Sequence, residues 1–385
     1  MSVETGNLSQ LAYVAESQFG TTPATPVGQL VRFTDLSISA DANYIDNPEF
    51  RKDNMRAVGR RGALRGKGSF GGKMSYGTVD DFMAAFCGQP WAANVAKIKD
   101  IDTMSAGGSV SVSAAGKTFT RASGSYITDG FAVGDVVQWA GFANAANNVS
   151  VVISTLTATV MTCTTATGLV DEATVVTARC STNCRPSFTF EKGHLVNGIY
   201  FPFTGVVIDG FTLSGKVNDA VDFRFDVLTK AVGNEANASV FSTLTAVNTN
   251  PLMTAWDGSI KRAGVAIANV VGWSLKGARN SDSAEVCGSS SLYDIQPKAA
   301  QITGSLELYF DSAQAYTDFR AETDLALQIN IGPGGTKSYQ IDLTKCRYKN
   351  WKGDPKDGMS TVTVDFESFA PDSGTNTSLM ITRIP

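Results

Sequence analysis

The sequence lacks the residues and motifs on which most enzymes depend. His194 is the only histidine among 385 residues, so any Ser-His or Cys-His nucleophile would need it as its base. It follows Glu191, Lys192 and Gly193 in an order typical of a hairpin turn, and we interpret it as a surface residue. Neither a GxSxG elbow nor an HExxH motif occurs. The sequence therefore predicts a protein that is not an enzyme, without catalytic residues or a cofactor.

An excess of positive charge and a long hydrophobic run are also missing. Lys plus Arg number 32 and Asp plus Glu 36, which argues against a dedicated nucleic-acid binder. The first ten residues, MSVETGNLSQ, have neither the basic nor the apolar region of a signal peptide. The longest weakly charged run, residues 149–170, is interrupted by many Ser and Thr residues. No membrane span is therefore predicted.

The motifs that could hold a metal or a nucleotide are incomplete. Cys180 and Cys184 are the only close pair among six cysteines, without the second pair that a zinc site needs, so we expect free thiols. Residues 66–71, GKGSFG, match the letters of a dinucleotide fingerprint, but the next helix is predicted to begin only near Thr78. Residues 354–358 are a turn that lacks the alternating carboxylates of a calcium loop. No metal site is predicted.

The chain is rich in Gly, Thr, Ser, Val and Ala and has few long helical patterns, which favours a mainly β protein. Residues 62–86 and 299–322 each predict a strand that opens on Gly-Ser, a short turn and a helix. We expect the first helix over residues 78–86 and the second from Asp311 or Ser312, which are good N-cap residues.

Each of these units is followed by a strand, a Gly/Asp turn and a strongly alternating strand, over residues 201–231 and 338–370. The alternating positions that correspond are Val221, Phe223, Phe225 and Val227 in the first and Val362, Val364, Phe366 and Ser368 in the second. Any two β-hairpins beside a helix would have a similar pattern. The shared order of strand, helix and hairpin nevertheless favours an internal duplication.

Other segments differ from this unit. Residues 98–184 shift to Ser, Thr, Val and Ala with regularly spaced turns, which predicts a small all-β module inserted at a loop and exposed on the outside of any assembly. Residues 232–261 are interpreted as a linker with room for a strand or a short helix. Residues 371–385 end in an apolar group and are expected to be frayed or docked on a neighbour.

Residues 13–26, YVAESQFGTTPATP, carry the sharpest pattern in the chain. An apolar strand is expected over Leu30–Leu36, which contains Phe33 and Thr34. Residues 13–26 resemble the opening of tail tube proteins (major tail proteins) of long-tailed bacteriophages, and the resemblance extends through Phe33-Thr34 and the strand-plus-helix unit. The resemblance covers most of the chain outside residues 98–184. It implies a β-sandwich or barrel flanked by a helix, stacked rings and a central channel for the genome.

The most basic part of the chain is residues 41–66, which we interpret as a long charged loop. In tube proteins the equivalent connection is an arm that reaches toward neighbouring subunits. A solvated loop and a DNA-gripping loop are the alternatives, but gripping would slow the exit of DNA. The matching connection in the second half, residues 277–298, is nearly neutral. The candidate inter-subunit residues are Arg51, Lys52, Arg56, Arg60, Arg61 and Arg65.

The predicted fold is mainly β, with duplicated tail-tube β-sandwich or barrel domains, each flanked by an α-helix, and an inserted small all-β module. We expect a discontinuous first tube domain (1–97 and 185–231), the module (98–184), a linker (232–261) and a second tube domain with its tail (262–385). Because family rings contain six tube domains, two per chain favour a trimer with pseudo-sixfold symmetry; a hexamer is the alternative.

The predicted function is that of a structural virion protein in the tail tube of a non-contractile phage tail (a siphophage tail), assembled in the host cytoplasm. The expected partners are further copies of the chain, the tape measure protein and the tail terminator or tip proteins. Genomic DNA would pass through the lumen without specific binding, and no membrane is involved. A β-rich surface adhesin or carbohydrate-binding module is the alternative.

Overall fold

A computed structural model describes residues 8–92, 94–98, 102–104, 109–164, 168–182, 184, 186–333, 336–353, 358–371 and 377–385, with the backbone alone at 102–104. Among these residues the protein is mainly β, as predicted, and its two α-helices are short. Residues of the strands predicted to correspond alternate between buried and less buried positions, as on β17 (Asp222–Val232) and β27 (Thr361–Phe369). One face of these strands therefore packs into a core and the other is polar.

The elements of the first half are β1 (Ser9–Ala15), β2 (Val27–Leu30), β3 (Asp35–Leu36), β4 (Ser39–Asn47), β5 (Ala57–Lys73), α1 (Asp80–Cys87), β6 (Val95–Lys97), β15 (Phe188–His194), β16 (Ile199–Lys216), β17 and β18 (Thr243–Thr245). Those of the second half are a 3-10 turn (Ala255–Asp257), β19 (Ser259–Arg262), β20 (Val265–Ala266), β21 (Val270–Ala278), β22 (Asp282–Ala284), β23 (Asp294–Gln296), β24 (Gln301–Tyr309), α2 (Gln314–Arg320), β25 (Leu325–Ile331), β26 (Ser338–Gly353), β27 and β28 (Met380–Ile384).

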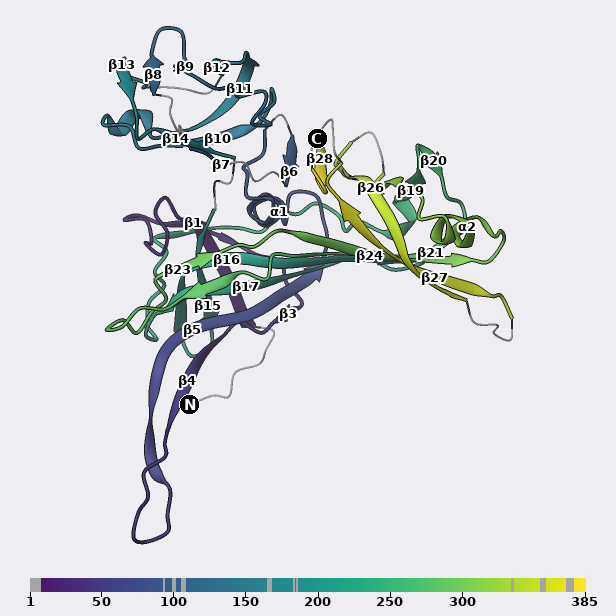
Figure 1. Cartoon of the computed structure of the whole chain (residues 1–385). Coiled ribbons are helices and arrows are strands. Elements are labelled where there is room, and N and C mark those ends of the chain that lie inside the picture. Colours follow the sequence, from purple (N-terminus) through teal and green to yellow (C-terminus); the bar gives the residue numbers. More distant parts are fainter. Residues whose placement is uncertain are drawn as a thin grey trace.

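Eight of these strands form one antiparallel path in the order β4-β5-β17-β16-β21-β24-β27-β26. β3 lies beside β4 at the same edge of β5. The path consists of two four-stranded units that meet where residues 210–216 of β16 pair with residues 272–278 of β21. Figure 1 shows this sheet running from the arm of β4 and β5 to the strands of the second half.

The two units have the same strand register. Eight residue pairs join β5 to β17, over 66–73 and 222–229, and eight join β24 to β27, over 302–309 and 361–368. Gly68 lies opposite Val227 in the first, and Gly304 lies opposite Phe366 in the second. The Gly-Ser steps predicted to correspond therefore occupy the same position in each sheet.

The irregularities of the two units coincide as well. On β16 the register shifts between Ile208 and Gly210, and on β26 it shifts between Tyr348 and Asn350. The pairing of β16 with β15 and the pairing of β26 with β25 each shift at a further matching place. Bulges are specific features of a strand pair, so their coincidence extends the internal similarity beyond the order of elements.

One apolar cluster joins both halves. It includes Phe70, Phe82 and Phe225 from the first half, and Leu306 and Ile341 from the second. α1 packs on β16 and α2 on β26, so each helix covers the apolar side of its own unit. The two halves are therefore continuous through their core as well as through their sheet.

The segment between β6 and β15 forms a separate sheet and core. Its strands are β7 (Asp102–Met104), β8 (Val110–Ser113), β9 (Thr118–Arg121), β10 (Val136–Ala140), β11 (Ser150–Leu156), β12 (Val160–Cys163), β13 (Glu172–Val175) and β14 (Arg179–Ser181), with a 3-10 turn at Ala145–Asn147. They pair only with one another within the described residues. Phe119 stacks on Trp139 at the centre of a second apolar cluster. Figure 1 shows this sheet set apart from the main body, on the side away from the arm.

Five local predictions were wrong. Residues 41–66 are mostly a β-ribbon rather than a loop, because residues 39–47 of β4 pair with residues 57–67 of β5. The expected strand Leu30–Leu36 is two short strands, β2 and β3. His194 ends strand β15, and Glu191 is buried there rather than in a turn.

The remaining two errors concern the second unit. α2 begins at Gln314, after both proposed N-cap residues. The alternating strands correspond two residues further along than expected, so Phe223, rather than Val221, matches Val362. A shift of two keeps every side chain on the same face, and for this reason the periodicity alone could not detect it.

Candidate assembly interface

The eight-stranded path ends in two edges that pair with nothing further in the part of the chain that the structure describes. One is the outer edge of β3 and β4. The other is the end of β26 from Arg347 to Gly353, whose opposite edge is paired with β27. Unpaired edges expose a row of backbone donors and acceptors and are natural sites for association with another chain.

The β26 edge carries side chains that are only partly covered. Lys349, Asn350 and Lys352 are exposed, and Trp351 is half-buried. The Trp351 ring lies edge-on to Tyr316 of α2, with 5.2 Å between centroids, and edge-on to Phe310 at 6.3 Å. Tyr316 is 42% exposed and Phe310 51% exposed. An aromatic group therefore lies open beside an unpaired strand.

The matching position in the first half is covered. Phe211 lies at the place on β16 that Trp351 has on β26, since each is the residue after the shifted pair. Its ring is edge-on to Phe86 of α1 at 4.7 Å, and both rings are buried. Gly277 of β21 lies opposite Phe211, and a Cβ there would overlap the Phe211 ring and come within 2.6 Å of Phe86. β21 thus covers in the first half what is open in the second.

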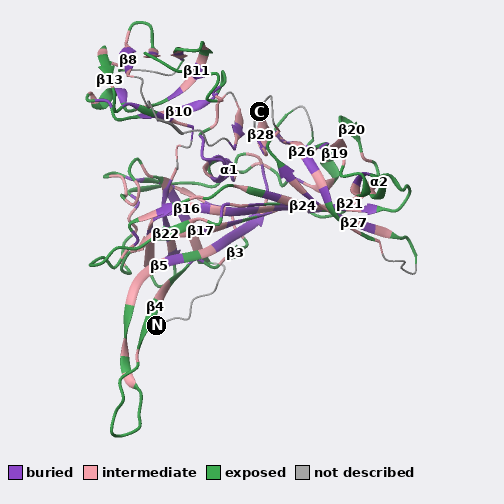
Figure 2. Ribbon diagram, in the orientation of Figure 1, coloured by how far each residue is buried: buried purple, intermediate pink, exposed green. Residues whose placement is uncertain are grey.

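The arm formed by β4, β5 and their connection projects from the body. Figures 1 and 2 show that it extends well beyond the sheet and is exposed over most of its length. Its apolar side chains are also exposed, namely Tyr44, Ile45, Phe50, Met55 and Val58. Apolar groups gathered on a projecting ribbon are typical of a surface that another protein covers.

The basic residues predicted for inter-subunit contact lie along this arm. Arg51 is ion-paired with Asp53 at 2.6 Å, and this hydrogen-bonded pair lowers the pKa of the Asp53 carboxyl. Arg56 lies 3.9 Å from Asp46. Arg65, at the base, lies 4.0 Å from Asp41 and 3.8 Å from Glu285. No described acidic group lies within 4.0 Å of the other three, Lys52, Arg60 and Arg61.

The corresponding connection of the second half, residues 277–298, folds back onto the first half. Leu292 and Ile295 are buried there. The Leu292 amide donates to the Lys230 carbonyl at 3.0 Å, and the Leu64 amide donates to the Ser290 carbonyl at 2.9 Å. The two connections differ in shape as well as in charge, and only the first is extended.

The polar face of the long sheet is a mosaic of hydroxyl groups and paired charges. Ser and Thr occupy it on several strands, at Ser69, Thr212, Ser214, Ser274, Ser305 and Thr363. The ion pairs include Lys67–Asp41 at 2.6 Å, Lys73–Asp222 at 2.9 Å, Arg224–Asp35 at 3.3 Å and Lys352–Asp365 at 3.3 Å. The charges of this face are therefore largely compensated within it.

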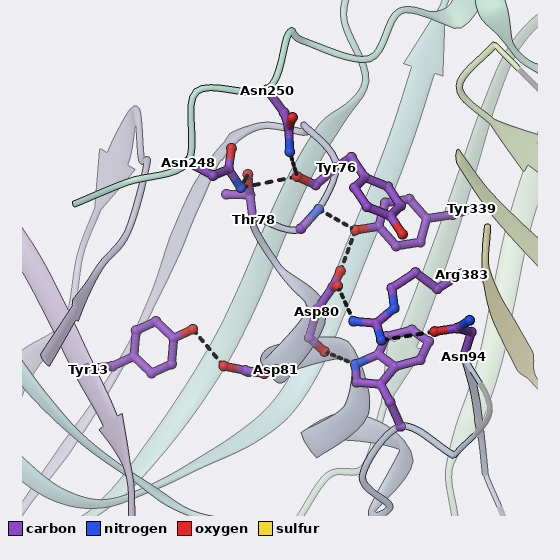
Figure 3. A network of polar contacts seen from close by, with 12 residues as sticks. Tyr13, Tyr76, Thr78, Asp80, Asp81, Asn94, Asn248, Asn250, Tyr339 and Arg383 are labelled. Atoms are coloured by element: carbon purple, nitrogen blue, oxygen red, sulfur yellow. Dashed lines mark hydrogen bonds and ion pairs between the residues drawn. The ribbon is translucent and has the colours of Figure 1, made fainter. Parts of the chain in front are cut away.

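A polar network ties the end of the chain to α1 (Figure 3). The Tyr339 hydroxyl and the Arg383 guanidinium, the latter at 2.8 Å, both donate to the Asp80 carboxylate. Burial, with the nearby Asp80 charge, raises the pKa of Tyr339, which keeps its hydroxyl protonated. Arg383 also donates to the Asn94 side chain at 3.1 Å. β28 pairs with β26 on one edge and with β6 on the other, so the described C-terminal segment is docked on its own chain, neither frayed nor docked on a neighbour as expected.

Asp80 and Asp81 lie in the first turn of α1, where their charges favour the positive end of the helix dipole. Their specific partners were not predicted. The Tyr13 hydroxyl donates to Asp81 at 2.8 Å from another part of the chain. Burial and Asp81 together raise the pKa of Tyr13. Arg262, which occupies on β19 the place of Tyr13 on β1, donates to Asp318 of α2.

Features of an enzyme site are not found in the described residues. No group of His, Cys, Asp or Glu side chains there could hold a metal ion. None of the six cysteines forms a disulfide, so Cys180 and Cys184 are not linked to each other. The glycines of residues 66–71 lie within β5, as predicted. The turn 354–358 lies outside the described residues except for Gly358. No described helix is long and apolar enough to cross a membrane.

Comparison with known proteins identifies the family. No curated protein matches the chain. A family model described as phage tail tube protein matches residues 6–368, which is nearly the whole chain and includes the inserted sheet. This match does not favour the adhesin or carbohydrate-binding alternative. The chain belongs to the phage tail tube protein family and is a structural component of the virion tail.

Proposed function

We propose that this chain assembles into stacked rings that form the tail tube of a long-tailed, non-contractile phage, and that the lumen conducts the DNA genome. The observation that carries the proposal is the pair of four-stranded units with one register, joined in a sheet that ends in two unpaired edges. A sheet of this kind can continue from chain to chain until it closes.

The same duplication favours three chains per ring. Each chain supplies two units, so three chains supply the six that family rings contain. The joint between β16 and β21 fixes the angle between successive units within a chain. Because the two connections differ, the sixfold symmetry of such a ring would be approximate and its threefold symmetry true. The division into two tube domains and one outer module is part of this proposal.

The polar face of the sheet suits the wall of a DNA channel. The opposite face carries α1, α2 and the apolar core and cannot face water. Cations with a carboxylate partner, such as Lys73 beside Asp222 and Arg224 beside Asp35, present little net positive charge to passing phosphates. DNA would then move along hydroxyl groups and neutral pairs without being held.

The arm is proposed to contact the adjacent ring, because it projects and exposes both apolar and basic groups. Reversal of Arg56, Arg60 and Arg61 to Glu should shorten the tubes and change their salt sensitivity, with the circular dichroism spectrum unchanged. Exposed charges contribute little to the stability of a single chain. Reversal of Lys117 and Arg179, which are exposed on the inserted module, is the control. An unchanged tube length in the arm variant would contradict the proposed role of the arm in ring stacking.

Negative-stain microscopy of the purified protein tests the proposed function most simply. Rings or tubes with a central channel are expected, with the tape measure protein occupying that channel during tail assembly and terminator or tip proteins at its ends. Monodisperse monomers over a wide concentration range would contradict the proposal, since the unpaired edges would then have no partner.

A further inference from the structure

We propose that neighbouring chains join by repeating the joint that each chain already contains. The unpaired end of β26 in one chain would pair antiparallel with the outer edge of β4 in the next chain. This inference rests on the proposed ring and adds to it the strands, the register and the facing residues.

The internal joint is the template. Across it Gly210 lies opposite Ala278, Phe211 opposite Gly277, and Thr212 opposite Lys276. At the joint, β16 uses the edge opposite the one that pairs with β17, and β21 uses the edge opposite the one that pairs with β24. All strands between the two ends of the path have a partner on both sides, whereas the end strands β4 and β26 have a partner within the path on one side.

The shared register identifies the equivalent residues on β26. Gly210 lies opposite Asp226 and Asn350 lies opposite Asp365, each directly after the shifted pair. Trp351 and Lys352 therefore take the places of Phe211 and Thr212.

The equivalents of β21 lie on β4. Lys276 lies opposite Thr303, one residue before Gly304, and Ser39 lies opposite Lys67, one residue before Gly68. Ser39 thus takes the place of Lys276. By the same count, the joint between chains pairs Lys352 with Ser39, Trp351 with Ala40, and Asn350 with Asp41.

Burial of the two units agrees with this pairing. Phe211 lies at the joint within the chain, and in the presence of the covering strand β21 it is 2% exposed. Trp351, whose joint is not made within the chain, is half-buried, and its neighbours Phe310 and Tyr316 are open. Ser39 and Ala40 are exposed on the other edge. A second copy of β4 over Trp351 would cover all of these groups at once.

The two joints differ in one facing residue. Gly277 leaves room for the Phe211 ring, whereas Ala40 at the equivalent place carries a Cβ, so the Trp351 ring must lie farther from the facing strand than the Phe211 ring does. Lys352 on the β26 edge, which is ion-paired with Asp365 at 3.3 Å, would lie diagonally across from Asp41 on the facing edge, which is ion-paired with Lys67 at 2.6 Å. Opposite charges across neighbouring strands stabilise a pair modestly and disfavour the wrong register.

The pairing cannot be made within one chain. Ser39 and Lys352 lie at the two ends of the eight-stranded path, seven strand steps apart. At about 4.8 Å per step, they are separated by roughly 34 Å along the sheet. A disulfide requires Cα atoms within about 7 Å, so any link between these positions must join two chains.

Disulfide trapping in assembled rings tests the inference. In a Cys287→Ser background, which removes the exposed native thiol, Ser39→Cys and Lys352→Cys are combined and the rings are oxidised mildly. Non-reducing electrophoresis should show covalent species of two and three chains. Thr212→Cys with Lys276→Cys is the matched positive control, because it places the same chemistry at the internal joint and should link within one chain.

A register control uses Ala40→Cys with Lys352→Cys. A slip of one residue turns the side chain to the other face, so this pair should link at least tenfold less. Rings in which the internal control links but the Ser39 and Lys352 pair does not would overturn the inference and leave the proposed function standing. Equal linking of the slipped pair would also overturn it. Failure of the parent protein to form any ring would instead refute the proposed function.

Discussion

Truncation of Trp351 and of Phe211 should have opposite consequences for folding and for assembly, although the two side chains occupy equivalent places. Phe211 is 2% exposed and packs edge-on to Phe86 in the isolated chain. Replacement of a buried Phe by Ala typically costs about 3–5 kcal/mol, since the lost contacts leave a cavity. Phe211→Ala should therefore lower the stability of the single chain by this amount.

Trp351→Ala should cost the isolated chain only about 1 kcal/mol, because the Trp351 ring is half-buried and its aromatic neighbours are themselves open to solvent. In the assembled ring of chains, a strand of the neighbouring chain would cover the Trp351 side chain. A central aromatic contact of an interface contributes about 2 kcal/mol or more. Three such joints in a closed ring would together weaken assembly by about 6 kcal/mol, or about four orders of magnitude in the overall equilibrium constant.

Two measurements separate these effects. Denaturant unfolding at a concentration below assembly gives the free energy of unfolding of each variant. Sedimentation over a concentration series gives the threshold above which rings appear. We expect Phe211→Ala to shift the first measurement and Trp351→Ala to shift mainly the second. Trp351 would have no role in assembly if Trp351→Ala destabilised the single chain as much as Phe211→Ala and left the assembly threshold unchanged.

Replacement of residues 98–184 by a short Gly/Ser linker should leave a soluble protein that still forms rings, because the inserted strands pair only with one another in the described structure and have their own core. Loss of assembly with a folded main body would show instead that the module lies in the ring contacts. A thiol reagent at pH 8 should modify one cysteine per native chain promptly, the exposed Cys287, and Cys287→Ser should abolish this phase. Burial raises the pKa of four other thiols to about 11 or 12, namely those of Cys87, Cys163, Cys184 and Cys346. They should stay protonated and unreactive until the pH approaches these values or the chain unfolds. Prompt modification of several thiols would contradict their burial.

Alternation made much of the two four-stranded units predictable from the sequence. β17 and β27 bury every second residue, so their apolar positions are visible as a period of two. The arm was misread because β4 has no buried face: its residues are exposed or half-buried throughout, and no period marks such a ribbon. Its basic composition was visible, and its extension from the body was not.

Contacts between distant segments were beyond the reach of sequence patterns. Tyr339 and Asp80 are 259 residues apart, and neither lies in a recognisable motif. The shared bulges of β16 and β26 involve different residues, Asp209 in one and Lys349 in the other, so similarity of letters could not reveal them. The unpaired edge at Trp351 became visible only when the strand pairs on both sides of β26 were known.

Native mass spectrometry of an isolated ring tests the central claim most directly. Two tube units per chain require three chains of 40.7 kDa each to supply the six units of a closed ring. We predict a ring mass of three chains and three external protrusions in cross-section, one for each inserted module. A ring mass of six chains with six protrusions would contradict the account, because each chain would then contribute only one unit to the channel.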